Sequence, residues 1–221
     1  MKILGLDTAT STTTVAVLGA GEALEEAADA PPPSSRGRHA EHVLTLAAGV
    51  LERAGLDWGE IDLLAVGVGP GGYTGLRIGL ATARGLALAH ATPLTGVGTL
   101  RALAEPIRGI TALALIDARR GELFSAAYLD DVEVLAPCVI APTQLPGLLA
   151  QAGATAVGDG THAHRDLLES AGHTVPEEGS ALHRVSAGAI CRIAARGGGG
   201  AAEPLYLRRP DAERSLPLAA R

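Results

Sequence analysis

The chain has 221 residues, 47% of them hydrophobic and 19% charged, which is enough for one large domain or two small lobes with a real core. The formal net charge of −6 argues against a protein whose main task is to grip nucleic acid, because phosphate contacts need clustered Lys and Arg. The negative charge is still compatible with a subunit whose partner binds the RNA. Aromatic residues make up only 2%, so the core must be built from Ala, Leu, Val and Ile.

The cysteines and the apolar segments indicate the compartment. Cys138 and Cys191 lie far apart and in no CxxC pair, so no disulfide or zinc framework is expected. The start, MKILGLDTAT, lacks the cationic region and long apolar core of a signal peptide. Val66–Ala89 comes closest to a membrane span, but Arg77 and Arg84 interrupt it. We therefore expect a cytoplasmic protein without a membrane span.

In the first half of the chain, short strands precede and separate two long helices. Glu22–Ala28 suits a strand or a helix equally by propensity, and the prolines of Ala30–Gly37 predict a loop. The other expected elements are strands at Lys2–Leu6, Thr14–Leu18, Ile61–Val68 and Pro93–Val97, and helices at His39–Ala54, Thr74–His90 and Thr99–Glu105.

The pattern restarts at Thr111, where a second apolar strand, Ala112–Ile116, ends at Asp117 as the first ends at Asp7. This indicates an internal duplication, with lobes at 1–106 and 107–208 and a loose tail at 209–221. Further strands are expected at Leu123–Leu129, Val132–Leu135 and Ala154–Val157, helices at Thr143–Gln151, His164–Ala171 and Ser186–Arg196, a flexible linker at Gly197–Gly200 and a docking segment at Pro204–Arg208.

The helix His39–Ala54 carries more apolar surface than one core requires. On a wheel of about 100° per residue its apolar side chains cover about 200°, whereas a surface helix needs a stripe of about 100°. Either a second element of this chain or another subunit must bury the excess. The residues of this arc are Ala40, Val43, Leu44, Leu46, Ala47, Ala48, Val50, Leu51 and Ala54.

The second helix is small or apolar almost all round. Gly75, Gly79 and Ala83 recur at i, i+4 and i+8 and form a smooth ridge. Each helical glycine costs roughly 0.5–1 kcal/mol relative to alanine, so retaining it makes sense where another backbone comes close. Arg77 and Arg84, seven residues apart, share one face. Burial within the chain and burial by a partner are equally compatible with this pattern.

Two turns are candidates for an anion or nucleotide site. Gly69–Thr74 exposes backbone N–H groups at a helix start but lacks the lysine and spacing of a phosphate loop, so it also reads as a structural turn with Thr74 as N-cap. Asp7, with Thr8, Thr10 and Ser11, suits a Mg-nucleotide or a hydrogen-bonded β-turn.

Two histidine pairs could be read as metal ligands, but neither has enough partners. His39 and His42 are better read as a solvated capping cluster, and His162 and His164 suit a helix entry. We expect no metal and no cofactor.

Several motifs follow one another along the chain: ILGLDTATSTTTVAV, RGRHAEHVLTL, GVGPGGYTGLRIGLATARGLALA, GVGTL, LIDARRGELF and PLYLR. In this order they resemble the TsaB (YeaZ) family of bacterial threonylcarbamoyladenosine biosynthesis proteins. The resemblance covers most of the chain. It implies an α/β, actin-like (ASKHA, ribonuclease H-like) fold of two lobes from an internal duplication.

The resemblance also implies a function. Such a protein is a non-catalytic partner and activator of the transferase TsaD in forming N6-threonylcarbamoyladenosine at position 37 of tRNA, with the ATPase TsaE joining and tRNA bound only within the complex. Its two N-lobe helices pack on those of the partner, or of a second copy, as a four-helix bundle. The expected interface residues are Val43, Leu46, Ala47, Val50, Gly75, Arg77, Gly79, Ala83 and Arg84.

The catalytic equipment of related proteins is reduced in this chain. The region Val97–Leu103 has no histidine where TsaD-like proteins carry a metal-binding HxxxH, and the turns read DTAT and DARRG rather than glycine-paired phosphate turns. We expect no catalytic residue. A vestigial nucleotide site would consist of Asp7, Thr8, Thr10, Gly69 and Gly71. The alternative is a small actin-like hydrolase that binds nucleotide on its own.

Overall fold

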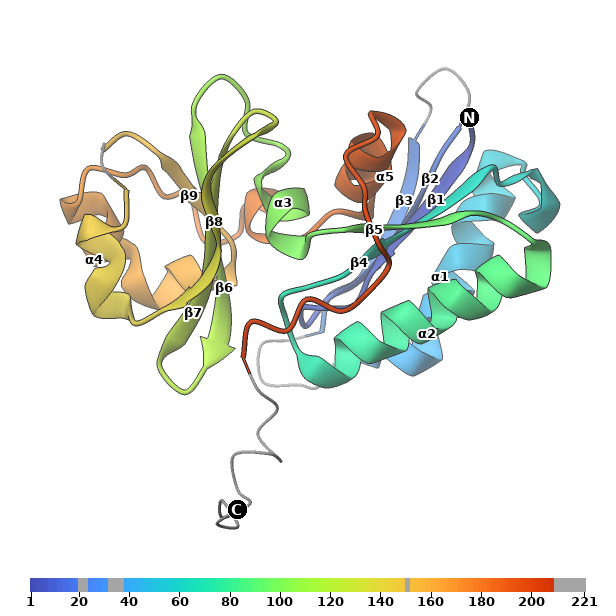
Figure 1. The fold of residues 1–221 in the computed structure, drawn as a ribbon, viewed down its shortest axis with the longest axis horizontal. Helices are drawn as coiled ribbons and strands as arrows, with labels where there is room; N and C mark the ends of the chain where they lie inside the picture. The colour runs from blue at the N-terminus through green and yellow to red at the C-terminus, as the bar shows by residue number, and fades with distance from the viewer. Residues whose placement is uncertain (20–23, 32–37, 150–151, 209–221) are drawn as a thin grey trace, which may run out of the picture.

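The computed structural model describes residues 1–19, 24–31, 38–149 and 152–208, which form two β-sheets lying side by side (Figure 1). Sheet A has the strand order β3-β2-β1-β4-β5, in which β1 and β2 pair antiparallel and β1, β4 and β5 run parallel. Its strands are β1 (Ile3–Asp7), β2 (Thr13–Leu18), β3 (Leu24–Asp29), β4 (Leu63–Gly67) and β5 (Leu94–Val97).

Sheet B repeats this topology. Its order is β8-β7-β6-β9, again an antiparallel meander with a parallel strand beside the first one. The strand-end turns repeat as well: Ala9 N donates to Asp7 Oδ1 over 2.8 Å, and Arg119 N donates to Asp117 Oδ1 over 2.7 Å. The predicted duplication is confirmed at the level of topology. The strands are β6 (Thr111–Arg119), β7 (Glu122–Leu129), β8 (Val132–Ile140) and β9 (Thr155–Val157).

Two long helices, α1 (His39–Ala54) and α2 (Tyr73–His90), cover one face of sheet A (Figure 1). The opposite face packs on α5 (Ala187–Ala195), while α3 (Thr99–Ala104) packs on β6, β7 and α5; both helices lie between the two sheets. The outer side of sheet B packs on α4 (Arg165–Ser170) and the 3-10 helix Pro142–Gly147. Apolar helix faces thus cover both faces of sheet A.

The last described segment returns to the N-terminal lobe. Helix α5 packs on β1 and β2, and Gly200 forms an antiparallel bridge to Gly96 beside β5. The prediction of a flexible linker at Gly197–Gly200 is therefore wrong, because backbone hydrogen bonds fix this segment. Docking of Pro204–Arg208 is confirmed: Leu205 N donates to Val68 O over 2.7 Å. The lobes predicted at 1–106 and 107–208 also differ from the structure. Helix α5 and the residues after it were assigned to the second lobe, but they pack with sheet A.

The remaining predictions agree in element type with a few differences in extent. The ambiguous third segment is a strand, and β8 runs on to Ile140 through Pro137, which an edge strand tolerates. The predicted helix at Thr143–Gln151 is a 3-10 helix, Pro142–Gly147. Most of the Ala30–Gly37 loop and the tail at 209–221 lie outside the described residues. Among the helices that the structure describes, none is long and apolar enough to cross a membrane.

Candidate functional site

The glycine-rich turn before α2 lies directly against the turn after β1. Gly72 N donates to Ala9 O over 2.6 Å, and a Cβ on Gly71 would lie 2.2 Å from that oxygen. Glycine is therefore required at position 71 by contact within the chain. Helix α2 begins at Tyr73 with Gly72 as N-cap, so the prediction that Thr74 caps the helix is wrong.

Asp7 lies at the end of β1 and is buried, with no exposed side-chain surface. Its Oδ1 accepts from Ala9 N over 2.8 Å, and its Oδ2 accepts from the Thr99 hydroxyl over 2.9 Å. Burial raises the pKa of the Asp7 carboxyl to about 6, against the opposing effect of these hydrogen bonds. Gly69 N donates to Thr99 Oγ1 over 3.1 Å, which holds in place the hydroxyl that binds Asp7.

The structure separates the five residues predicted for a vestigial nucleotide site. Thr8 is buried and donates its hydroxyl to Gly75 O over 2.7 Å, so it fastens β1 to α2. Asp7 and Gly69 are also inside the protein, and only Thr10 and Gly71 line open space. The two turns thus meet as predicted, but most of their polar groups bind one another.

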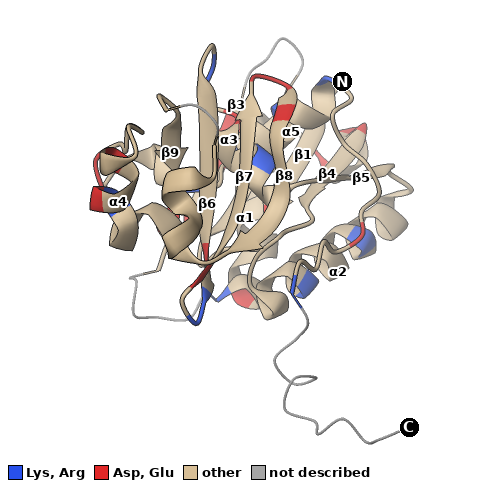
Figure 2. Ribbon diagram, turned by 60° about the vertical axis from the view of Figure 1, so that its left-hand side comes forward, with Lys and Arg blue, Asp and Glu red and all other residues tan. Residues whose placement is uncertain are grey.

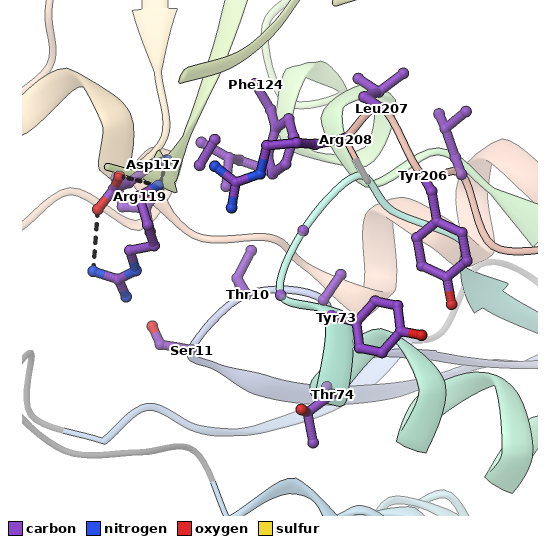
Figure 3. A pocket seen from close by; sticks show the side chains of 18 of the residues that line it. Thr10, Ser11, Tyr73, Thr74, Asp117, Arg119, Phe124, Tyr206, Leu207 and Arg208 are labelled. Atoms are coloured by element: carbon purple, nitrogen blue, oxygen red, sulfur yellow. Dashed lines mark hydrogen bonds and ion pairs between the residues drawn. The ribbon is translucent and has the colours of Figure 1, made fainter. Parts of the chain in front are cut away.

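That open space is a cleft of about 560 Å³ between the lobes. Figure 3 shows Asp117 and Arg119 on one wall, Tyr73 and Tyr206 on the other, and Thr10 and Ser11 between them. On the first wall Arg119 Nη1 lies 3.1 Å from Asp117 Oδ2, and its side chain is 75% exposed. Burial raises the pKa of the neighbouring Asp159 carboxyl.

The second wall carries a compact aromatic and cationic cluster, which we call the Tyr73–Arg77–Tyr206 cluster. The two tyrosine rings lie 5.3 Å apart, and the Arg77 guanidinium stands 3.9 Å above the ring of Tyr73. Arg77 Nε also donates to the Tyr206 hydroxyl over 3.0 Å. The sequence did not single out Tyr206, although its motif PLYLR was expected to dock.

The histidine pairs do not form metal sites. Within the part of the chain that the structure describes, no group of three or more His, Cys, Asp or Glu side chains is arranged to hold a metal ion. His39 is buried with Nδ1 2.8 Å from Thr13 Oγ1, which corrects the prediction of a solvated cluster. His42 Nδ1 lies 2.6 Å from Asp29 Oδ2, and His162 packs edge-on against His183.

Most residues expected at a partner interface are buried inside this chain. On α1, Val43, Ala47 and Val50 are at most 1% exposed because they face sheet A, and Leu46 is half-buried on the side towards β3. In this structure these side chains pack within the chain, and their contact with a partner stays a prediction.

The ridge on α2 is likewise used within the chain. A Cβ on Gly75 would lie 2.1 Å from Thr8 O, a Cβ on Gly79 would lie 2.3 Å from Thr8 Oγ1, and Ala83 is fully buried. These small residues let α2 lie directly on β1, so the contacts that require them here are within the chain. Arg77 is exposed and binds Tyr206, and Arg84 is exposed and donates to Ala202 O over 2.7 Å.

A different set of side chains forms the uncovered surface of the two helices. On α1, His42 and Arg53 bind residues of β3, so the opposite flank of α1 faces α2. On α2, the flank with Arg77 and Arg84 binds the C-terminal segment, so its opposite flank faces α1. In the sequence of α2 the charged residues are Arg77 and Arg84, which account for the blue positions on this helix in Figure 2. We call this exposed or half-exposed surface the outer face; it consists of Ala40, Leu44, Ala48, Ile78, Ala81, Gly85 and Leu88.

Three features of the outer face are unusual for a surface covered only by water. Leu88 is 86% exposed and Leu44 is 50% exposed. Gly85 lies in mid-helix, where it destabilises the helix, yet a Cβ there would meet nothing within 4 Å. No contact within the described residues accounts for glycine at this position.

The repeated sheets, their shared turns and the cleft between the lobes define a two-lobed protein of the actin-like (ASKHA) class. A family model described as "TsaD: tRNA N6-adenosine threonylcarbamoyltransferase" matches residues 30–163. TsaB of Escherichia coli, a "tRNA threonylcarbamoyladenosine biosynthesis protein", is 33% identical over 98% of this chain and 99% of its own length.

Solved structures agree with this assignment. YeaZ from Pseudomonas aeruginosa superposes with a TM-score of 0.79 at 25% identity, covering 93% of this chain and 99% of that one. The ethanolamine utilization protein EutJ from Carboxydothermus hydrogenoformans, at 13% identity and a TM-score of 0.53 over 86% of this chain and 90% of its own, shares the fold alone. The chain belongs to the TsaB (YeaZ) family, within the wider family that the TsaD model describes.

Proposed function

We propose that this protein is a non-catalytic partner and activator of a TsaD-type transferase in the threonylcarbamoylation of tRNA adenosine 37. Near-full-length similarity to a named threonylcarbamoyladenosine biosynthesis protein supports the pathway. The match to the TsaD family model is compatible with a paired arrangement, because two chains of related fold can meet through equivalent helices as the two copies in an isologous dimer do.

The outer face is the observation that carries the proposal. It presents Leu44 and Leu88 to solvent, surrounded by alanines, and Gly85 permits a second helix to approach its backbone closely. A pair of partner helices laid on this surface would complete a four-helix bundle. The same face would serve a homodimer, and a TsaE-type ATPase would join the resulting complex elsewhere.

The state of Asp7 supports a non-catalytic role. A carboxylate that holds Mg-nucleotide must face the cleft, whereas Asp7 is fully buried and bound by Ala9 and Thr99. Gly71 and Gly72, which would offer N–H groups to a phosphate, are packed against Ala9 O. These contacts do not favour the alternative of an independent nucleotide hydrolase.

Reconstitution tests the function directly. The purified transferase, the ATPase and threonylcarbamoyl-adenylate would be incubated with tRNA, with and without this chain, and the modified nucleoside measured by mass spectrometry. We expect modification to depend on this chain and the chain to co-purify with the transferase. Full modification in its absence would contradict the activator role.

Calorimetry of the isolated chain with Mg-ATP tests the non-catalytic part separately. We expect weak or no heat of binding and no phosphate release. Tight binding that disappears in Asp7→Ala, with matching ATP hydrolysis, would support the hydrolase instead.

A further inference from the structure

Aromatic side chains are concentrated at the cleft. The whole chain has five of them, and three, Tyr73, Phe124 and Tyr206, line this one cavity. Tyr73 is 37% exposed and Tyr206 is 40% exposed, although large aromatic rings on a surface usually seek cover. Phe124 is buried and belongs to the core, whereas the two exposed tyrosines do not. Their position therefore points to a ligand with a flat, apolar face.

Arg77 adds a positive charge to this surface. Its contacts among the described residues are to the two tyrosines, through ring stacking and one hydrogen bond from Nε, and none is to a carboxylate. The hydrogen bond and the ring fix the orientation of the guanidinium, which keeps its other N–H groups for an anion. The cluster thus offers a flat surface for a base beside a cation for a phosphate.

The cleft has the size and the polarity to take such a ligand. Its volume of about 560 Å³ lies within the range of about 300–1,000 Å³ typical of small-ligand pockets. Across from the tyrosines, Asp117, Asp159 and the exposed Arg119 supply hydrogen-bonding groups suited to the edge of a base. Two arginines line the cleft, but Arg119 pairs with Asp117 and Arg208 pairs with Glu122. Arg77 does not line the cleft itself but contacts Tyr73 and Tyr206, which do, so we place the phosphate beside the tyrosines on the side of Arg77.

We infer that the Tyr73–Arg77–Tyr206 cluster and the cleft beside it bind an unpaired nucleotide of an RNA strand. The cluster stacks on the base and Arg77 contacts a backbone phosphate, in the manner of sequence-tolerant single-strand binding. RNA is favoured over a free Mg-nucleotide because Asp7, the carboxylate nearest the turns, is locked inside the protein. A contact to one nucleotide is compatible with the net charge of −6, since the site does not need a basic surface.

This inference goes beyond the proposed function, because a protein that binds its partner through α1 and α2 does not have to touch RNA. The cleft and the outer face adjoin at Ile78, which lines both, but Tyr73 and Tyr206 are not part of the outer face. The affinity of the tyrosine variants for the transferase is therefore measured beside their affinity for RNA.

Fluorescence anisotropy of a labelled unstructured RNA nonamer with the full chain at low salt provides the test. We expect a Kd on the order of 10⁻⁵–10⁻⁴ M that weakens with added salt. Tyr73→Ala and Tyr206→Leu, on different elements, should each weaken binding about five- to 100-fold. Tyr206→Phe keeps the ring and should retain most of the affinity. His90→Ala, which breaks the other exposed ring stack, with Trp58, serves as the matched control and should bind like the unmodified chain.

Three results would overturn the inference. The first is no RNA binding, or binding that the tyrosine variants leave unchanged. The second is Mg-ATP competing better than unlabelled RNA of equal nucleotide concentration, which would identify a free mononucleotide as the ligand. The third is tyrosine variants that retain RNA affinity but lose affinity for the transferase, which would make the cluster a protein contact.

Discussion

The Thr99 hydroxyl donates a hydrogen bond of 2.9 Å to Oδ2 of Asp7, joining the start of α3 to the end of β1 across 92 positions of sequence. Thr99 Oγ1 in turn accepts from Gly69 N. The three strand-end segments of sheet A are thereby tied together at the place where an actin-like nucleotide-binding protein would hold its ligand. In this chain the side chain of Asp7 connects these segments inside the protein.

The buried Asp7 carboxyl predicts a pH-dependent stability. Burial raises its pKa to about 6 from the ordinary value of 3.8, so the folded protein binds more protons than the unfolded chain between these values. The contribution of Asp7 to the free energy of unfolding is therefore most favourable below about pH 4 and is lost as the pH rises through 6. In urea unfolding, the free energy of unfolding of Asp7→Asn relative to that of the unmodified chain should rise by up to about 3 kcal/mol from pH 4 to pH 7. Parallel pH profiles of the two proteins would contradict this account of Asp7.

Two glycines of α2 should respond oppositely to alanine. Gly79→Ala places a Cβ 2.3 Å from Thr8 Oγ1, and we expect a loss of about 1–3 kcal/mol as α2 is pushed off β1. Gly85→Ala meets no atom and should stabilise the isolated chain by about 0.5–1 kcal/mol through helix propensity. Thermal denaturation of both variants measures the contrast. Equal effects would mean that the close approach at Thr8 is not what retains Gly79.

Glu105 is a buried carboxylate that links α3 to the end of α5. It is 4% exposed, and Arg196 Nη2 donates to both of its oxygens, at 2.8 and 2.9 Å, while Arg108 binds Oε1. Glu105→Gln should cost about 1–3 kcal/mol in urea unfolding, because the arginines lose a charged acceptor. Glu169→Gln is the matched control: its ion pair with Arg165 is at the surface and should contribute less than about 1 kcal/mol. A Glu105 variant as stable as the control would contradict a structural role for this ion pair.

Local patterns in the sequence were sufficient to predict the secondary structure and the duplication. Helix α1 has the predicted bounds, because its apolar arc and the following Gly55 define where it begins and ends. The repeat of an apolar strand ending in Asp predicted the second sheet, and the structure reproduces even the Asp7 and Asp117 turns. These features depend on neighbours in sequence.

Most of the interface residues chosen from the sequence are buried within the chain, for a physical reason. The helical wheel showed that the apolar arc of α1 is wider than a single packing surface requires. It could not show which part of the arc faces sheet A. The centre of the arc, at Val43, Ala47 and Val50, packs on sheet A, and the excess lies on the flank with Leu44 and Ala48. Likewise, the wheel could not reveal that Thr8 lies beneath Gly75 and Gly79. Only the tertiary structure separates these glycines from Gly85.

The affinity of this chain for a TsaD-type transferase, measured by isothermal titration calorimetry with variants of the outer face, tests the central proposal most directly. Gly85→Arg places a long charged side chain in the middle of that face, and Leu88→Glu removes its most exposed apolar group. Gly179→Arg is the matched control, since Gly179 is also exposed with no atom near its added Cβ but lies in the other lobe. We predict that both outer-face variants fold normally and lose at least about tenfold in affinity, a change of about 1.4 kcal/mol, while the control binds as before. Unchanged affinity in both outer-face variants would contradict the proposal that this face receives the partner.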